Sequence, residues 1–274
     1  MSKPYSLLVS HQRVGETKSR RQTESTCGGP KVVNMKRAAD YQTILFDVGG
    51  TLLNIVRDPH MIAVEAVAHL GDLSAAEFAA AIREVVGEWR ATGGLPELED
   101  LPETWVGHNR RALTLTGFAG DIAAAAQIME DVFLSEGLEV YPDVVEALKT
   151  LIGWGYKLGV VSNWPATLEP TLQRVGLREY FSSIVASGTV GYAKPHPSIF
   201  RIAMDRMGVD PYHALYVGDS VEHDVGGAQA AGMNVVLLDR VGRHEAHQPS
   251  ISSLMQLFEL LRPEATQPAT GADR

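Results

Sequence analysis

The stretch Thr43-Ile-Leu-Phe-Asp47-Val-Gly-Gly-Thr51 places a carboxylate and a glycine turn directly after an apolar run. Residues 44–46 predict a short buried strand, and Gly50 allows a sharp turn that Thr51 can hold by a local hydrogen bond. An aspartate at the end of an apolar strand is costly unless a metal ion or ligand uses it. Asp47 is therefore a candidate functional residue, although an ordinary turn aspartate remains the alternative.

Three more polar stretches follow in order along the chain. Ser162-Asn163 and Gly218-Asp219-Ser220 each come directly after a predicted strand, Asp224 is close behind the second, and Lys194-Pro195 lies between them. Ligands of open α/β sheets bind at the carboxyl ends of the strands. The four stretches together predict one anionic, metal-dependent site.

The composition is that of a globular protein. The chain has 274 residues, 45% of them hydrophobic, which is enough for one large domain or for a domain with a second one inserted. No apolar run approaches the roughly 20 residues of a membrane span, so we expect no membrane partner. The single Cys27 cannot form an intramolecular disulfide, which fits a cytoplasmic location.

Charge is distributed unevenly. The net charge is −9, but residues 1–40 hold eight Lys and Arg against three Asp and Glu, which leaves 16 Lys and Arg against 30 Asp and Glu in the rest. An acidic body disfavours nucleic acid as a partner. We expect residues 1–40 to be a disordered leader, or Met35 to be the true start of the protein, rather than a transit peptide. We expect residues 263–274 to be a disordered tail.

The pattern changes from strand to helix after Thr51. Ser74-Ala-Ala-Glu77 has the spacing of a capping box at a helix start, and helical patterns follow at 103–116 and 121–136. Nothing in 55–138 indicates a strand hairpin. We expect residues 55–138 to be an all-helical cap domain of four or five helices.

The remainder, residues 41–54 and 139–262, alternates strands with helices. Such alternation predicts an α/β core with a doubly wound, Rossmann-like parallel sheet and helices on both faces. The expected strands after the first are 157–162, 183–187, 214–218 and 234–238, and the expected helices are 143–153, 166–176, 197–208, 224–231 and 251–261.

From about Thr43 to Leu261, the ordered motifs resemble those of the haloacid dehalogenase-like hydrolase superfamily. The gap of 115 residues between Asp47 and Ser162 is where the helical-cap members of that superfamily carry their cap. The resemblance implies that Asp47 is the nucleophile and forms an aspartyl-phosphate, and that Lys194 neutralises both nucleophile and phosphate. It also implies that substrate is bound by Thr51, Ser162 and Asn163.

The acidic motif points to a metal ion. Oxygen ligands without a clustered His or Cys favour a hard cation, and a phosphate site favours Mg²⁺. By resemblance, Asp219 is a direct ligand with Asp224 close behind it, and Asp47 and the backbone carbonyl of Gly49 complete the site. Capping of the following helix by Ser220 or Asp224 is the alternative, and it is compatible with metal binding.

Gly49 is the main departure from the superfamily, whose phosphatases have a second Asp there as general acid and base. Candidate replacements are Asp58, His60, Glu65, Glu103 and His108, and side chains that could select the substrate are Arg57, Trp105, Arg110 and Arg111. Two branches of the superfamily lack that Asp. Phosphonoacetaldehyde hydrolases need a cap Lys, and no Lys occurs between Lys36 and Lys149. Haloacid dehalogenases need no metal, so Asp219 and Asp224 make that reading less favoured.

The sequence therefore predicts a Mg²⁺-dependent phosphatase that acts on a small phosphorylated metabolite. The main alternative is a catalytically weak relative that binds phosphate and serves a binding or regulatory role.

Overall fold

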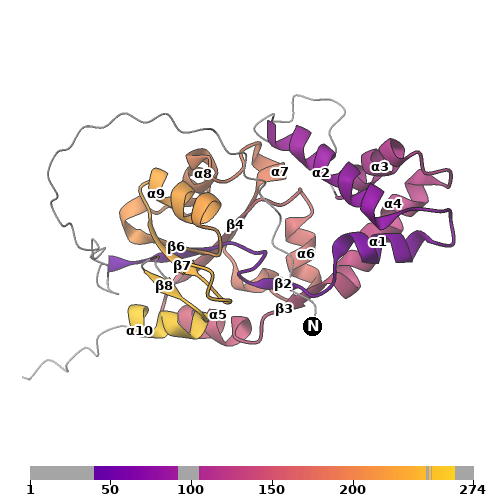
Figure 1. The fold of residues 1–274 in the computed structure, drawn as a ribbon. Coiled ribbons are helices and arrows are strands. Elements are labelled where there is room, and N and C mark those ends of the chain that lie inside the picture. Colours follow the sequence, from indigo (N-terminus) through magenta and orange to yellow (C-terminus); the bar gives the residue numbers. More distant parts are fainter. Residues whose placement is uncertain (1–39, 92–104, 245–246, 248, 263–274) are drawn as a thin grey trace, which may run out of the picture.

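The computed structural model describes residues 40–91, 105–244, 247 and 249–262. A six-stranded parallel sheet runs through one part of the molecule, in the order β5-β4-β1-β6-β7-β8 (Figure 1). Its strands are β1 (Thr43–Phe46), β4 (Lys157–Ser162), β5 (Ser183–Ala186), β6 (Ala214–Gly218), β7 (Asn234–Leu238) and β8 (Ser250–Ile251). The predicted α/β fold class is confirmed.

Helices cover both faces of this sheet because its strands are apolar on both sides. In β1, Ile44 and Phe46 pack into one cluster of buried residues and Leu45 into another. The first cluster includes α5 (Val144–Gly153), α6 (Leu168–Arg174) and α10 (Leu257–Leu261), and the second includes α8 (Pro197–Met207) and α9 (Gly227–Ala230). Figure 1 shows α5 and α10 on one side and α8 and α9 on the other.

Within residues 55–138, the described part of the chain forms four α-helices that pack on one another: α1 (Pro59–Val67), α2 (Ala75–Ala91), α3 (Trp105–Thr116) and α4 (Ile122–Val132). Asp58 begins α1 by accepting from the backbone N–H of His60, and the N–H of Glu77 reaches Ser74 Oγ at 3.5 Å. These helices have their own apolar core, which includes Phe78, Leu113 and Met129. We call α1–α4 the helical insert.

Short strands that the sequence did not predict flank the insert. β2 (Leu53–Ile55) pairs antiparallel with β3 (Leu138–Val140), and a π-helix (Phe133–Gly137) joins α4 to β3. Each strand has only three residues, and the partners lie at opposite ends of the insert. No local hairpin signal could therefore announce the pair.

The other differences lie near the ends of predicted elements. The helix expected at 251–261 is β8, a 3-10 turn (Leu254–Gln256) and α10, and the helix expected at 224–231 is a π-helix (Val221–Gly226) followed by α9. The structure adds α7 (Ser187–Val190) and 3-10 turns at Arg178–Tyr180 and Pro211–His213. Among the described residues, no helix is long and apolar enough to cross a membrane. The predicted leader, apart from Asp40, and the predicted tail lie outside the described residues.

Candidate active site

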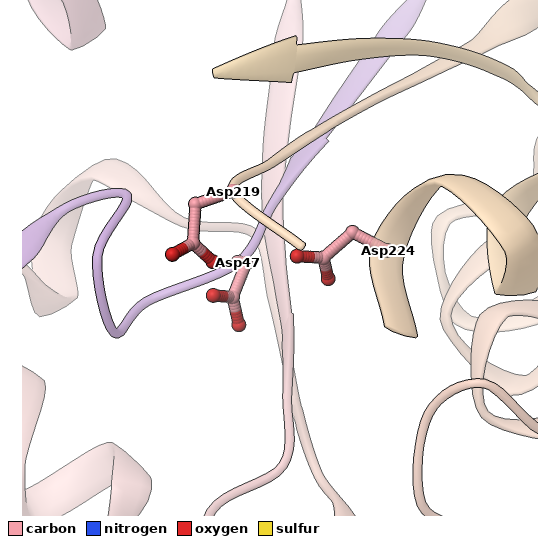
Figure 2. A group of neighbouring side chains, drawn as sticks. All are labelled: Asp47, Asp219 and Asp224. Atoms are coloured by element: carbon pink, nitrogen blue, oxygen red, sulfur yellow. The ribbon is translucent and has the colours of Figure 1, made fainter. Parts of the chain in front are cut away.

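Three carboxylates meet at the carboxyl edge of the sheet. Asp47 follows β1, which lies between β4 and β6, and Asp219 and Asp224 come from the loop and π-helix after β6. One oxygen of each carboxylate lies within 4.8 Å of the others, and Figure 2 shows the three groups turned toward one another. The sequence thus predicted this convergence correctly.

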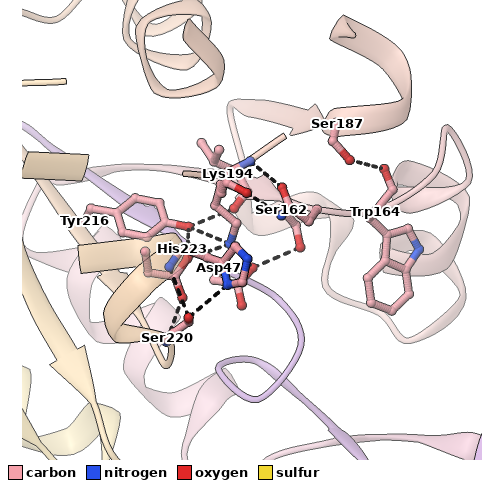
Figure 3. Close-up of polar contacts among 11 residues, drawn as sticks. Asp47, Ser162, Trp164, Ser187, Lys194, Tyr216, Ser220 and His223 are labelled. Carbon is pink, nitrogen blue, oxygen red and sulfur yellow. Dashed lines mark hydrogen bonds and ion pairs between the residues drawn. The ribbon is translucent and has the colours of Figure 1, made fainter. Parts of the chain in front are cut away.

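Lys194 forms ion pairs with two of these carboxylates. Its Nζ is 2.6 Å from Asp47 Oδ1 and 2.6 Å from Asp224 Oδ1, and the Lys194 side chain is only 4% exposed. Ser162 Oγ donates to Asp47 Oδ1 at 2.9 Å (Figure 3). One oxygen of Asp47 is therefore held by a hydroxyl and an ammonium group, which fixes the direction of the carboxylate.

Asn163 fixes the backbone of Lys194. Its Oδ1 accepts from the Lys194 N–H at 2.6 Å, and its Nδ2 donates to the Lys194 carbonyl at 2.9 Å. Both ends of the amide are thus used to hold Lys194. The contact between Asn163 and substrate stays a prediction.

Tyr216, in β6, is a member of the site that the sequence reasoning missed. Its hydroxyl accepts from Lys194 Nζ at 3.2 Å and lies 3.0 Å from Asp224 Oδ1 and 2.9 Å from the carbonyl oxygen of Val161 (Figure 3). From the sequence, Tyr216 is expected to be an ordinary core residue, because Leu215 and Val217 on either side of it are apolar. The missed signal is that a tyrosine in a fully buried strand needs a partner for its hydroxyl.

The loop after β6 is fixed by its own polar groups. Asp224 Oδ2 accepts from the Ser220 N–H at 2.9 Å, and Ser220 Oγ accepts from the His223 N–H at 3.1 Å. Ser220 Oγ also lies 3.1 Å from His223 Nδ1. Ser220 is therefore the helix cap, as the alternative reading allowed, while the Asp224 carboxylate bonds to Ser220 and Lys194.

The two glycines of the turn after Asp47 differ in whether the structure requires a glycine there. Gly50 has φ +78°, and a Cβ there would lie 2.3 Å from Asp219 Oδ2, so a side chain is excluded. Gly49 has no such restriction, since the nearest atom to a Cβ would be Trp164 Cζ3 at 4.0 Å. The structure therefore requires glycine at position 50 but accepts a Cβ at position 49.

Burial and mutual repulsion shift the pKa values of the cluster. Burial, assisted by the Asp224 carboxylate, raises the pKa of Asp47 although Lys194 opposes it. Asp219 reaches solvent but has protein on most sides, and this desolvation, with the charges of Asp47 and Asp224, raises its pKa to about 7. Burial would lower the pKa of Lys194, but Asp224 and Asp47 outweigh it and raise the pKa.

The donor set fits a divalent cation. Three carboxylates face one ammonium group, which leaves two negative charges when all three are ionised. All side-chain donors are oxygen atoms, the ligands that Mg²⁺ prefers. Within the described part of the chain, the carbonyl of Gly49 accepts no backbone hydrogen bond and is available as a further oxygen.

Thr51 lies at the end of the turn that follows Asp47. Its N–H donates to the Val48 carbonyl at 3.3 Å, and its carbonyl accepts from Arg240 Nη2 at 2.8 Å. Thr51 Oγ1 is buried and has no hydrogen-bond partner among the described residues, so the expected local side-chain bond is not formed. The main chain holds this turn instead.

The candidates for the role of general acid lie within the insert and make other contacts. His60 packs edge-on against Phe78 at 6.1 Å, and burial lowers its pKa. Burial also lowers the pKa of His108, to about 4. Asp58 caps α1, and Glu65 pairs with Arg57. None of the contacts of Asp58, His60 and Glu65 given above joins them to the carboxylate cluster, and Glu103 lies outside the described residues.

The candidates for substrate selection also belong to the insert. Arg57 bonds to Glu65 at 2.6 Å and to Glu136 at 3.1 Å, and Arg111 lies 3.9 Å from Glu88. Arg110 is exposed, and the side chain of Trp105 is outside the described set. Their role stays a prediction.

The family model of the haloacid dehalogenase-like hydrolases matches residues 41–232. The chain belongs to this family. The predicted resemblance is confirmed, and so is the prediction of a hydrolase.

Several relatives are similar to this chain over most of their length. The chain is 32% identical to a glyceraldehyde 3-phosphate phosphatase of Methanopyrus kandleri, over 81% of this chain and 94% of that one. It is 31% identical to a phosphoglycolate phosphatase of Escherichia coli, over 72% of this chain and 81% of that one.

Solved structures of the family include more than one chemistry. A phosphatase of the family from Thermococcus onnurineus has a TM-score of 0.58 at 25% identity, and a 2-haloacid dehalogenase from Pseudomonas syringae has 0.62 at 25% identity. Each alignment covers 81% of this chain and 98% of the other. The fold alone therefore does not select between phosphatase and dehalogenase.

Proposed function

We propose that this protein is a Mg²⁺-dependent phosphatase that hydrolyses a small phosphorylated metabolite through an aspartyl-phosphate on Asp47. The observation that carries the proposal is the buried Lys194 ammonium, 2.6 Å from both Asp47 and Asp224, beside a third carboxylate. This arrangement combines a fixed nucleophile, a fixed positive charge and a set of oxygen ligands, which are the parts that phosphoryl transfer needs.

In the first step, the free oxygen of Asp47 attacks phosphorus and the bond from phosphorus to the leaving oxygen breaks. Water then attacks the phosphorus of the aspartyl-phosphate, and inorganic phosphate and the Asp47 carboxylate are released. Lys194 holds Asp47 in position and offsets the added charge, and Ser162 orients the carboxylate through its 2.9 Å bond. Mg²⁺, held by Asp47, Asp219, Asp224 and the Gly49 carbonyl, would neutralise the phosphoryl oxygens.

The substrate class rests on the relatives and on the insert. Phosphatases of glyceraldehyde 3-phosphate and of phosphoglycolate are among the similar proteins, which supports a small phosphate ester. We further propose that residues 55–138 act as a cap domain over a core of residues 41–54 and 139–262, that Arg57, Arg110 and Arg111 contribute to substrate selection, and that the protein acts in the cytoplasm without nucleic acid or membrane partners.

Gly49 is the feature that keeps a second function open, namely a catalytically weak protein that binds phosphate for a regulatory purpose. General acid–base catalysis is typically worth about 10²–10⁴-fold, and the position that supplies the Asp for it in phosphatases of the superfamily is Gly49 here. The phosphatase proposal therefore includes a preference for weakly basic leaving groups, such as aryl and acyl phosphates, and accumulation of the phosphoenzyme.

The test is hydrolysis of p-nitrophenyl phosphate by the full chain with Mg²⁺, with EDTA, and in Asp47→Asn. We expect turnover with Mg²⁺ alone, preceded by a burst of p-nitrophenol, and none in Asp47→Asn. Phosphate binding without turnover would favour the regulatory function, and release of halide from a 2-haloacid in EDTA would favour a dehalogenase. A panel of phosphorylated metabolites then identifies the substrate.

A further inference from the structure

Arg240, on the loop after β7, makes contacts to two distant parts of the chain. Its Nη1 and Nη2 each donate to one oxygen of Asp143 at 3.0 Å, and Nη2 also donates to the Thr51 carbonyl at 2.8 Å. The guanidinium carbon lies 3.9 Å from the centre of the Tyr141 ring. The Arg240 side chain is 13% exposed and that of Asp143 14%, so this is a largely desolvated two-point ion pair.

The partners of Arg240 lie where the chain passes between the sheet and the helical insert. Thr51 ends the turn after Asp47 and leads into β2. Tyr141 directly follows β3, where the chain comes back from the insert to the sheet. The Tyr141 N–H donates to the Leu52 carbonyl at 3.1 Å, and the Tyr141 hydroxyl donates to Asn54 Oδ1 at 3.3 Å. Figure 1 shows β2 and β3 between the sheet and α1–α4. One guanidinium thus contacts both connections.

Both ends of the Arg240 contact are themselves fixed. Asp143 also accepts from Ser253 Oγ at 2.7 Å and from the Leu254 N–H at 2.9 Å. Desolvation would raise the pKa of Asp143, but the hydrogen bonds from Arg240, Ser253 and Leu254 outweigh it and hold the pKa below its usual value. On the other side, the Asp239 carboxylate accepts from the N–H groups of Arg243 and His244, which fixes the loop that carries Arg240.

We propose that Arg240 is a positioning residue, which holds the turn after Asp47 and the two connections to the helical insert, beside β2 and β3, in one relative arrangement. It touches no reacting atom and acts through the Thr51 carbonyl and the Tyr141 ring. Its kinetic consequence rests on the proposed phosphatase function. Lysine cannot replace it, because an ammonium group cannot form the two-point bond, reach the Thr51 carbonyl and stack on a ring at once.

The kinetic experiment compares Arg240→Ala, Arg240→Lys and Arg178→Ala. Arg178 is the control, since it also bonds to a carboxylate, that of Glu169, and to a carbonyl, that of Phe181. It precedes β5 and so lies near the amino ends of the strands, whereas the site lies at their carboxyl ends. A small displacement of a reacting group can cost about 10²-fold. We expect kcat/KM for p-nitrophenyl phosphate to fall about 10- to 100-fold in Arg240→Ala, to recover only partly in Arg240→Lys, and to be unchanged in Arg178→Ala.

Chemical rescue separates positioning from general stability. Millimolar guanidinium should restore part of kcat in Arg240→Ala, while methylammonium at the same ionic strength should not. Activity within twofold of wild type in Arg240→Ala, or an equal loss in Arg178→Ala, would overturn the proposal. If Arg240→Ala does not fold, Arg240→Gln gives the same comparison.

Hydrogen exchange tests Arg240 without any turnover. The Gly50 N–H donates to the Leu53 carbonyl at 2.8 Å, and the Tyr141 N–H to that of Leu52. We expect peptides covering 50–54 and 138–143 to exchange at least tenfold faster in Arg240→Ala and at the wild-type rate in Arg178→Ala. If the wild type hydrolyses no phosphate ester, the proposed function fails while this readout still stands, and unchanged exchange in both peptides overturns the role of Arg240.

Discussion

Replacement of Lys194 by methionine should make the fold depend on the charge state of the cluster. The Nζ lies 2.6 Å from both Asp47 and Asp224, and the three side chains are 4%, 8% and 1% exposed. Removing one partner of a buried ion pair typically costs about 3–5 kcal/mol, because the remaining charge stays buried without compensation. At roughly 2–4 °C per kcal/mol for a domain of this size, the melting temperature should fall by about 6–20 °C.

The loss should grow with pH. In wild type, the pKa of Asp47 is already raised by burial, and Lys194 is the group that opposes this shift. Without Lys194, the folded state holds a proton on Asp47 up to a higher pH than the unfolded state does. The unfolded state therefore binds fewer protons in that range, and the stability of the variant falls as the pH rises.

Differential scanning calorimetry in EDTA at pH 5.5 and pH 8 is the measurement. The exposed Lys149, on α5, provides the control, since Lys149→Met should change stability by less than about 0.5 kcal/mol. Mg²⁺ should recover part of the loss in Lys194→Met, because a bound cation replaces the missing positive charge. Equal melting temperatures of wild type and Lys194→Met at pH 8 would show that the buried ion pairs do not stabilise this fold as argued.

Asp219→Asn should weaken the affinity for Mg²⁺, measured by calorimetric titration, while leaving the melting temperature without Mg²⁺ unchanged; an unaltered affinity would place the ion elsewhere. Gly49→Asp should raise turnover of alkyl phosphates by up to about 10²-fold and remove the burst, because the backbone there accepts a Cβ, whose nearest neighbour would be Trp164 Cζ3 at 4.0 Å. Wild type should lose up to about 3 kcal/mol as the pH falls from about 6.5 toward 4, because the pKa of His108 is lowered to about 4 by folding and the unfolded state takes up the proton first. In urea titrations, His108→Leu should lack that part of the pH dependence.

The parts of the fold that were predictable are those with strong local periodicity. The strands around Asp47, Ser162 and Asp219 are apolar runs that end in polar residues, and they occupy adjacent positions β4-β1-β6. The pair β2 and β3 could not be predicted because three-residue strands carry almost no pattern and gain stability only from each other. The helix expected at 251–261 begins later than predicted for a related reason. Ser250–Ile251 forms a strand by pairing with β7, and that pairing is not visible in the local sequence.

The candidate site was predictable in its motif residues but not in every group that holds them. Motif positions identify Asp47, Lys194 and Asp219 from the sequence alone. Tyr216 and Arg240 could not be found in this way, because each acts through contacts with residues far away in the chain, such as Val161 and Thr51. Such contacts depend on the register of neighbouring strands and on loop geometry, neither of which leaves a local pattern.

The ion pairs within the cluster also give its three carboxylates different roles. Lys194 binds Asp47 and Asp224, while Asp219 is paired with no cation among the described residues and is the one of the three that reaches solvent. Its carboxylate lies close to the Gly50 turn, where a Cβ would be 2.3 Å from Asp219 Oδ2. A cation that enters from solvent therefore meets a carboxylate that is paired with no cationic side chain within the described chain. The charge that Mg²⁺ would neutralise is thus concentrated at Asp219, and Lys194 neutralises charge at Asp47 and Asp224. This division explains why we expect the loss of Lys194 to change the fold and the loss of Asp219 to change metal affinity.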